Sequence, residues 1–176
     1  MTRWLTDGQW VYDTYSPDEP SETFEGLAPM VSRWQVKRDS HPNRHIPSWS
    51  DFDLGDLEGF WGWSTVYDVV DTSIPSFVVR LWGTNVARIC GYDITGQTIT
   101  ADNRPHVADY VSITANDVRF LAHLATHQLI GFSGGPYVAE LEDWKQYREL
   151  HLPLSNDGET ITNILMVGWL SAHGTV

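Results

Sequence analysis

Two histidines four positions apart are the first residues whose types and spacing could do chemistry. His123 and His127 fall in a segment with helical periodicity, where this spacing can present two imidazoles to one metal ion. At about 100° per residue, His127 lies at the border of the apolar stripe and His123 lies further toward solvent. No cysteine or carboxylate stands at a matching spacing. The pattern therefore favours two histidines at the solvent edge of a helix, and we expect no metal site.

Arg80 is the most notable charged residue, because it interrupts an apolar run between Val78 and Trp82. Its forked guanidinium could hold the carboxylate or phosphate of a ligand. The alternative is a structural ion pair with one of the many acids, for example Asp51 or Asp53. The structural reading is the favoured one.

Three aspartates close together, Asp51, Asp53 and Asp56, superficially resemble a calcium-binding loop. An EF-hand needs a ligand at position five, glycine at six and glutamate at twelve. Here Gly55 stands at five, Asp56 at six and Gly62 at twelve. A capping and turn role therefore fits these aspartates better.

Sequence motifs typical of catalysis are missing from the sequence. Paired catalytic acids, a Ser-His-Asp order and a phosphate loop are not recognisable in it. Ser133 stands among the glycines of Gly131–Gly135, but the segment lacks the G-x-S-x-G order of a nucleophile elbow. We therefore predict no catalytic residue and expect the protein not to be an enzyme.

Composition narrows the class of protein further. Apolar residues make up 41% and aromatic residues 12% of the 176 positions, so the chain must bury surface. The net charge of −12 repels phosphate backbones and anionic lipid, which disfavours nucleic acid as a partner. Cys90 is the single cysteine, and the N-terminus has no apolar stretch of a signal peptide. No run approaches the roughly 20 apolar residues of a membrane span, so we expect a soluble cytoplasmic protein without a membrane partner.

The pattern of elements predicts one α+β domain after an N-terminal extension. Residues 1–21 lack sustained periodicity and are interpreted as an arm, and Glu22 to Asp39 form an amphipathic helix. A longer helix spans Ser112–Ile130, Asn85–Ile89 is a helical turn, and Gly134–Pro136 is a tight loop. The remaining signals give a five-stranded antiparallel sheet with helices collected on one face, the strands being Gly62–Val70, Ser76–Trp82, Tyr137–Asp143, Trp144–Leu154 and Thr160–Leu170.

The last predicted strand also indicates how the two faces of the sheet are covered. Both alternation sets of Ile161–Leu170 are largely apolar, so both faces of this strand should be covered. The helices between the second and third strands can cover one face. The other face is left for the Glu22–Asp39 helix or for the same surface of a second subunit.

This order of elements, together with the sequence motifs within it, resembles a variant PAS-domain family of bacteria in which the domain forms most of a short protein. The similarity extends over about Pro47 to Leu170, although Trp49 and Gly55 depart from the family pattern. The resemblance rests on four sequence motifs: IPSWSDFDLGDL (Ile46–Leu57), FVVRLWGT (Phe77–Thr84), GYDITGQT (Gly91–Thr98) and ELHLPLSNDGETITNIL (Glu149–Leu165).

The resemblance implies a PAS-like domain over residues 46–176, preceded by the arm and helix of residues 1–45. It further implies a sheet that cups short helices around a small-molecule pocket, and a sensory protein. Because no output domain is recognisable, the signal would leave through a regulatory protein partner, and the outer sheet face favours a homodimer. The candidate ligand-binding residues are Arg80 as polar anchor and, as pocket walls, Trp82, Ile89, Ile94, Phe120, Leu124 and Tyr147.

Two cofactors of PAS relatives are disfavoured by the residues. A haem would need a histidine of the long helix to face the pocket, whereas His123 and His127 lie toward solvent. A flavin adduct would need an Asn-Cys-Arg-Phe context, but Cys90 stands between Ile89 and Gly91. The cofactor, if there is one, is therefore left open.

Two other functions stay open beside the sensor. The first is a ligand-free interaction module, in which the same core is filled and only the surface binds a protein. The second is a small enzyme of the isomerase or dehydratase kind on a cone-shaped α+β barrel, which needs a buried Asp or His facing the pocket. His151 and Asp68 are the strand-borne candidates for that role, and both are expected to face outward.

Overall fold

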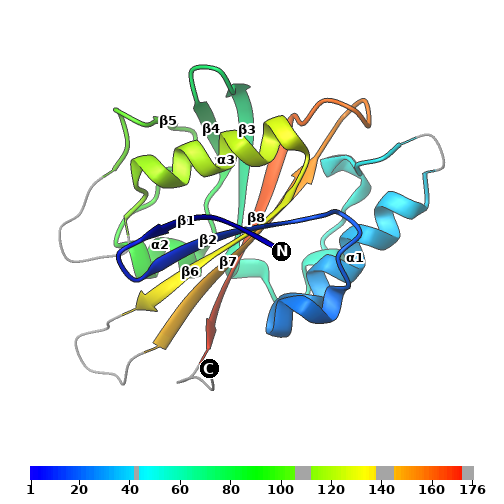
Figure 1. The fold of residues 1–176 in the computed structure, drawn as a ribbon, viewed down its shortest axis with the longest axis horizontal. Coiled ribbons are helices and arrows are strands. Elements are labelled where there is room, and N and C mark those ends of the chain that lie inside the picture. The colour runs from blue at the N-terminus through cyan, green and yellow to red at the C-terminus, as the bar shows by residue number, and fades with distance from the viewer. Residues whose placement is uncertain (42–43, 106–111, 138–144, 172–176) are drawn as a thin grey trace.

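The computed structural model describes residues 1–41, 44–105, 112–137 and 145–171. Its centre is one antiparallel sheet of eight strands in the order β1-β2-β6-β7-β8-β3-β4-β5 (Figure 1). The strands are β1 (Thr2–Asp7), β2 (Trp10–Tyr15), β3 (Ser64–Asp71), β4 (Ser76–Leu81), β5 (Thr98–Thr100), β6 (Ile130–Tyr137), β7 (Lys145–Leu154) and β8 (Asn163–Ser171).

The predicted five-stranded α+β fold is therefore wrong, because the sheet has eight strands and dominates the structure. Two of the unpredicted strands, β1 and β2, form a hairpin from the supposed arm, with Gly8 at φ 60° in its turn. Strand β2 shows no alternation in the sequence because Tyr12, Asp13, Thr14 and Tyr15 are all buried. A strand covered on both faces loses the period of two that makes strands recognisable.

The third predicted strand, Tyr137–Asp143, is also misplaced. Strand β6 spans Ile130–Tyr137, and residues 138–144 lie outside the described residues. Gly131 and Gly135 were interpreted as the end of a helix and as a loop, but both lie within this strand. A Cβ on Gly131 would collide with Leu124, and one on Gly135 would come within 2.7 Å of the Trp10 ring. These glycines make room for side chains that lie over the strand.

The helices agree better with the sequence. A 3-10 segment, η1 (Ser21–Leu27), leads into α1 (Ala28–Asp39), which ends where the predicted helix ends. Helix α2 (Thr84–Cys90) ends at Gly91 with φ 78°, and α3 (Ala115–His127) is shorter than predicted at both ends. Short 3-10 turns, η2 (Trp49–Asp51), η3 (Gly55–Leu57) and η4 (Trp61–Trp63), connect α1 to β3. None of the described helices is long and apolar enough to cross a membrane.

The sheet is covered on both faces, with α3 on one side of the central strands and α1 on the other (Figure 1). Strand β8 is accordingly buried over its first six residues, which confirms the expectation of two covered faces. The N-terminal helix supplies the second cover, because Trp34 donates its indole N–H to the carbonyl of Pro153 at 2.8 Å. In the same layer, Gly26 lies directly beneath the ring of Trp169.

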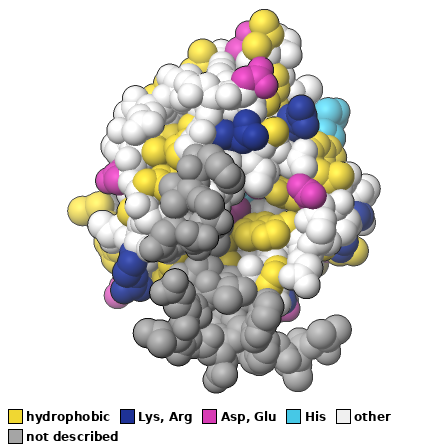
Figure 2. Space-filling model, turned by 90° about the vertical axis from the view of Figure 1, so that its left-hand side faces the viewer, with side chains coloured by type: hydrophobic (Ala, Val, Ile, Leu, Met, Phe, Trp, Pro, Cys, Tyr) yellow, Lys and Arg dark blue, Asp and Glu magenta, His cyan; other side chains and the backbone are white. Residues whose placement is uncertain are grey.

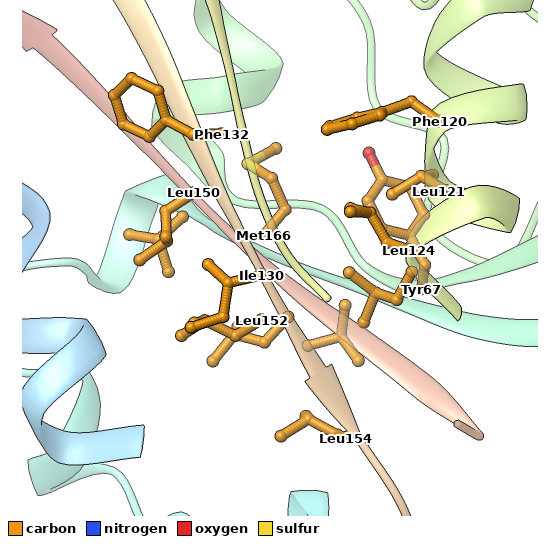
Figure 3. Packing of buried hydrophobic residues seen from close by; sticks show 14 of the residues in the cluster. Tyr67, Phe120, Leu121, Leu124, Ile130, Phe132, Leu150, Leu152, Leu154 and Met166 are labelled. Atoms are coloured by element: carbon orange, nitrogen blue, oxygen red, sulfur yellow. The ribbon is translucent and has the colours of Figure 1, made fainter. Parts of the chain in front are cut away.

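The core therefore has two halves, one on each face of the sheet. Figure 3 shows Phe120, Leu121 and Leu124 of α3 gathered with Tyr67 on one side of the strands. The leucines of β7 lie with Phe132 on the other side, toward α1. The layer between the sheet and helices α2 and α3 is called the cup below, because the polar residues of interest lie in it.

Candidate functional site

Strand β7 brings two ionisable side chains into the cup. Its alternation places Tyr147, Glu149 and His151 on the α3 side and Leu150 and its leucine neighbours on the α1 side. His151 is 5% exposed and its ring stands edge-on to Phe120 of α3 at 5.6 Å between centroids. The expectation that His151 faces outward is therefore wrong, and the polar face of this strand is the inner one.

Ser133 of β6 links these two side chains. It lies opposite Glu149 in the β6–β7 register and is fully buried. Its hydroxyl donates to Oε2 of Glu149 at 3.0 Å and lies 3.1 Å from Nε2 of His151. The same carboxylate oxygen is 3.6 Å from that Nε2.

The serine, histidine and glutamate do not form a catalytic triad. In a triad the acid holds Nδ1 of the histidine, and Nε2 is left to take the serine proton. Here Glu149 and Ser133 both approach Nε2, and Nδ1 of His151 is buried without a hydrogen-bond partner. The arrangement is suited to holding a polar group in place.

A second acid enters the cup from the first turn of α3. Asp117 accepts a hydrogen bond from the Tyr12 hydroxyl at 2.8 Å and one from the backbone N–H of Thr114 at 2.6 Å. Thr114 and Asp117 form a capping box, which fixes the carboxylate at the helix N-terminus. Burial and then the negative charge of Glu149 raise the pKa of Asp117 to about 6.

The raised pKa of Asp117 predicts an unusual pH dependence of stability. Between its ordinary value of 3.8 and about 6, the folded chain holds a proton that the unfolded chain has lost. The contribution of Asp117 to the free energy of unfolding therefore falls as pH rises through this window. We expect Asp117→Asn to gain about 1 kcal/mol relative to wild type between pH 4 and pH 7, after solvent screening. Urea unfolding at several pH values measures this, and a difference constant with pH would contradict it.

Three buried side-chain atoms on this face of the sheet have no hydrogen-bond partner among the described residues. They are Oγ1 of Thr65, Oη of Tyr147 and Nδ1 of His151. Thr65 and His151 flank Met166 in one row across β3, β8 and β7, and the Tyr147 ring lies over Gly168. Gly168 is the register partner of Glu149, so the Tyr147 hydroxyl lies beside that acid. The unpartnered atoms therefore lie on the same face of the sheet as Glu149 and Ser133.

The negative charge of Glu149 acts on several side chains of the cup. Burial and then Glu149 raise the pKa of the Cys90 thiol to about 12, and the same two causes hold the pKa of the Tyr147 hydroxyl well above its ordinary value. Burial and then Glu149 also raise the pKa of Tyr67.

The residues predicted to bind a ligand divide into two groups. Arg80 lies on the opposite face of the sheet, where its Nε donates to Oδ1 of Asp68 at 2.8 Å and half of its side chain is exposed. It is therefore a structural ion pair, with Asp68 in place of the suggested Asp51 or Asp53. The six residues predicted as pocket walls are all buried, and one of them, Tyr147, lines the cup. The other five are Trp82, Ile89, Ile94, Phe120 and Leu124.

The remaining candidates have local roles. Asp51 completes a capping box with Ser48, and Asp53 and Asp56 accept hydrogen bonds from each other's backbone N–H, as a turn role requires. His123 and His127 have ring centroids 4.3 Å apart, and His127 is exposed. No group of three metal-binding side chains occurs within the described ranges.

Sequence reasoning missed most of the cup. Tyr12, Thr65, Asp117 and Ser133 were not singled out from the sequence as binding residues. Glu149 was noted only as part of a motif that resembles the PAS-domain family. One signal was present: in RELHLPL, polar residues alternate with leucines that must themselves be buried. Such a strand between two helical layers can present its polar set inward.

No family model, curated protein or solved structure matches this chain. The resemblance to sensory domains therefore stays a prediction, and the cup is the feature of the structure that bears on function.

Proposed function

We propose that the protein is a regulatory protein that binds a small molecule in the cup. The observation that carries this proposal is the set of unpartnered buried atoms of Thr65, Tyr147 and His151 on one face of the sheet. A buried polar group without a hydrogen bond costs about 1–3 kcal/mol, so native proteins rarely keep one. Tyr147 lies beside Glu149, and His151 and Thr65 follow on the same face, so a polar ligand against this face can supply partners that the described residues do not.

Strand β2 connects the cup to the opposite face of the sheet. Strand β2 contributes Tyr12, which hydrogen-bonds Asp117, and Tyr15, whose ring packs on Phe24 of η1 at 4.8 Å. A ligand that changes the position of Asp117 or Tyr12 would therefore act on the segment leading into α1. A ligand can shift the protein only by binding one such arrangement better than another. We propose that a regulatory protein partner detects this shift.

One further candidate function is favoured by a specific observation. The enzyme alternative required a buried Asp or His facing the pocket, and His151 with Ser133 at 3.1 Å meets that requirement. Binding is preferred because Ser133 is fully buried and because its Oγ and the carboxylate compete for the same nitrogen. The ligand-free interaction module is the third alternative and predicts a cup that nothing enters.

Native mass spectrometry of the gently purified protein tests the proposal. We expect a fraction of the chain to carry a non-covalently bound small molecule, released on denaturation. We expect Thr65→Val, which keeps the side-chain shape and removes the hydroxyl, to retain less of it. Thr98→Val is the matched control, because Thr98 is exposed in β5.

Retention of nothing by the wild-type chain, with no thermal shift in metabolite extracts, would support the ligand-free interaction module. Equal retention by Thr65→Val and the control would place the molecule outside the cup. Conversion of the molecule during incubation, abolished in Ser133→Ala, would favour the enzyme.

A further inference from the structure

Apart from His151, whose Nε2 lies 3.6 Å from the Glu149 carboxylate, the described charged side chains of the cup are acidic. Glu149 and Asp117 both face it, and the negative charge of Glu149 acts on Asp117 strongly enough to raise its pKa. Arg80 and Arg148 are held on the opposite face by Asp68 and Glu25. No lysine or arginine side chain that the structure describes is paired with Glu149 or Asp117, as the described ion pairs show (Arg3–Asp13, Lys37–Asp56, Arg38–Asp18, Arg38–Asp39, Arg44–Asp51, Arg80–Asp68 and Arg148–Glu25).

Aromatic rings stand around the same acid. The Tyr147 ring lies 6.4 Å from that of Trp10 and 6.3 Å from that of Trp63, centroid to centroid. On the α3 side, Tyr12 meets Phe120 edge-on at 5.2 Å. The faces of such rings carry partial negative charge and attract cations, most strongly where water is excluded. Figure 2 looks onto the end of the molecule where the β1–β2 turn lies, and hydrophobic side chains gather on this face.

One unpartnered atom lies where such a cation would bind. The Tyr147 hydroxyl oxygen, which lies beside Glu149, can accept a hydrogen bond. A primary ammonium has three N–H donors and no acceptor, so it can donate to the Glu149 carboxylate and to this hydroxyl together. The Tyr147 side chain is fully buried, so solvent at the surface does not serve its hydroxyl.

We propose that the ligand of the cup is a small organic cation, a primary amine or alkylammonium, whose charge pairs with Glu149. This inference rests on the proposed small-molecule function and specifies its ligand class. Asp117 supports the site from the helix N-terminus, and the aromatic rings cover the alkyl part of the ligand.

Two matched sets of probes test the charge of the ligand. One set is n-butylamine, n-butanol and butyrate, and the other is 2-phenylethylamine, 2-phenylethanol and phenylacetate. Calorimetric titration of the full chain at pH 7.5 and low salt measures their affinities. We expect the amine of at least one set to bind about tenfold or more tightly than its alcohol, and the acid to bind weakest.

Glu149→Gln tests the residue. We expect it to lose about tenfold or more in affinity for the amine and to keep its affinity for the alcohol, which also shows that the cup is still formed. Glu22→Gln is the matched control, because Glu22 is exposed in η1 on the other face. Asp117→Asn gives a second variant in which the preference for the amine should weaken.

Several outcomes would overturn the inference. Tighter binding of an acid or an alcohol than of its amine would show that the ligand is not cationic and would leave the small-molecule function standing. Binding of no probe would count against the cation, while native mass spectrometry judges the function separately. An unchanged amine affinity in Glu149→Gln would remove Glu149 from the site.

Discussion

A chain that begins at Pro17, without the β1–β2 hairpin, is expected not to fold cooperatively. Strand β2 pairs with β6 at five positions, and its Tyr12 and Tyr15 are almost fully buried on opposite faces. Loss of one large buried aromatic side chain costs about 3–5 kcal/mol, and two such losses approach the whole stability of a typical domain. The deletion also leaves the edge of β6 unpaired, which favours aggregation.

Circular dichroism, thermal unfolding and size-exclusion chromatography of residues 17–176 measure this effect. Deletion of residues 1–8 alone is the matched control, because β1 is largely exposed and β2 remains in the sheet. We expect that control to fold with a modest loss, because Trp4 no longer packs on Phe120. An unfolding midpoint of residues 17–176 equal to that of the full chain would show that the hairpin is not part of the core.

The hairpin illustrates why part of the sheet was predictable and part was not. Strands β3, β4 and β8 carry apolar runs bounded by turn residues, and helix α2 ends at Gly91, a glycine with positive φ. These signals are local, so the sequence alone reveals them. Strand β2 has no such signal, because its burial comes from α3 on one face and η1 on the other.

The cup was missed for a related reason. A half-buried strand is ordinarily expected to turn its polar residues to solvent, and RELHLPL was interpreted in that way for His151. In the structure the leucines and His151 are both buried, because α1 lies over the leucines while Phe120 of α3 packs on His151. The unpartnered atoms of Thr65 and Tyr147 depend on contacts between strands far apart in the sequence, which no local pattern contains.

The second large effect is expected from Trp34→Ala in α1. Trp34 is fully buried between the helix and the sheet, and its indole N–H donates to the Pro153 carbonyl at 2.8 Å. Removal of the ring leaves a cavity and an unpaired carbonyl, so we expect a loss of about 4 kcal/mol in the free energy of unfolding. Urea unfolding followed by circular dichroism measures it.

Two further variants divide this loss between packing and hydrogen bonding. Trp34→Phe keeps most of the ring and removes the donor, so it should lose clearly less than the alanine variant. Trp61→Ala deletes the same side chain at a site 47% exposed, and we expect a loss below about 1 kcal/mol. If Trp34→Ala were as mild as Trp61→Ala, α1 would be a dispensable cover of the sheet. The expected result instead makes residues 1–45 and 46–176 one cooperative unit, because Trp34 and Pro153 belong to different sides of that division.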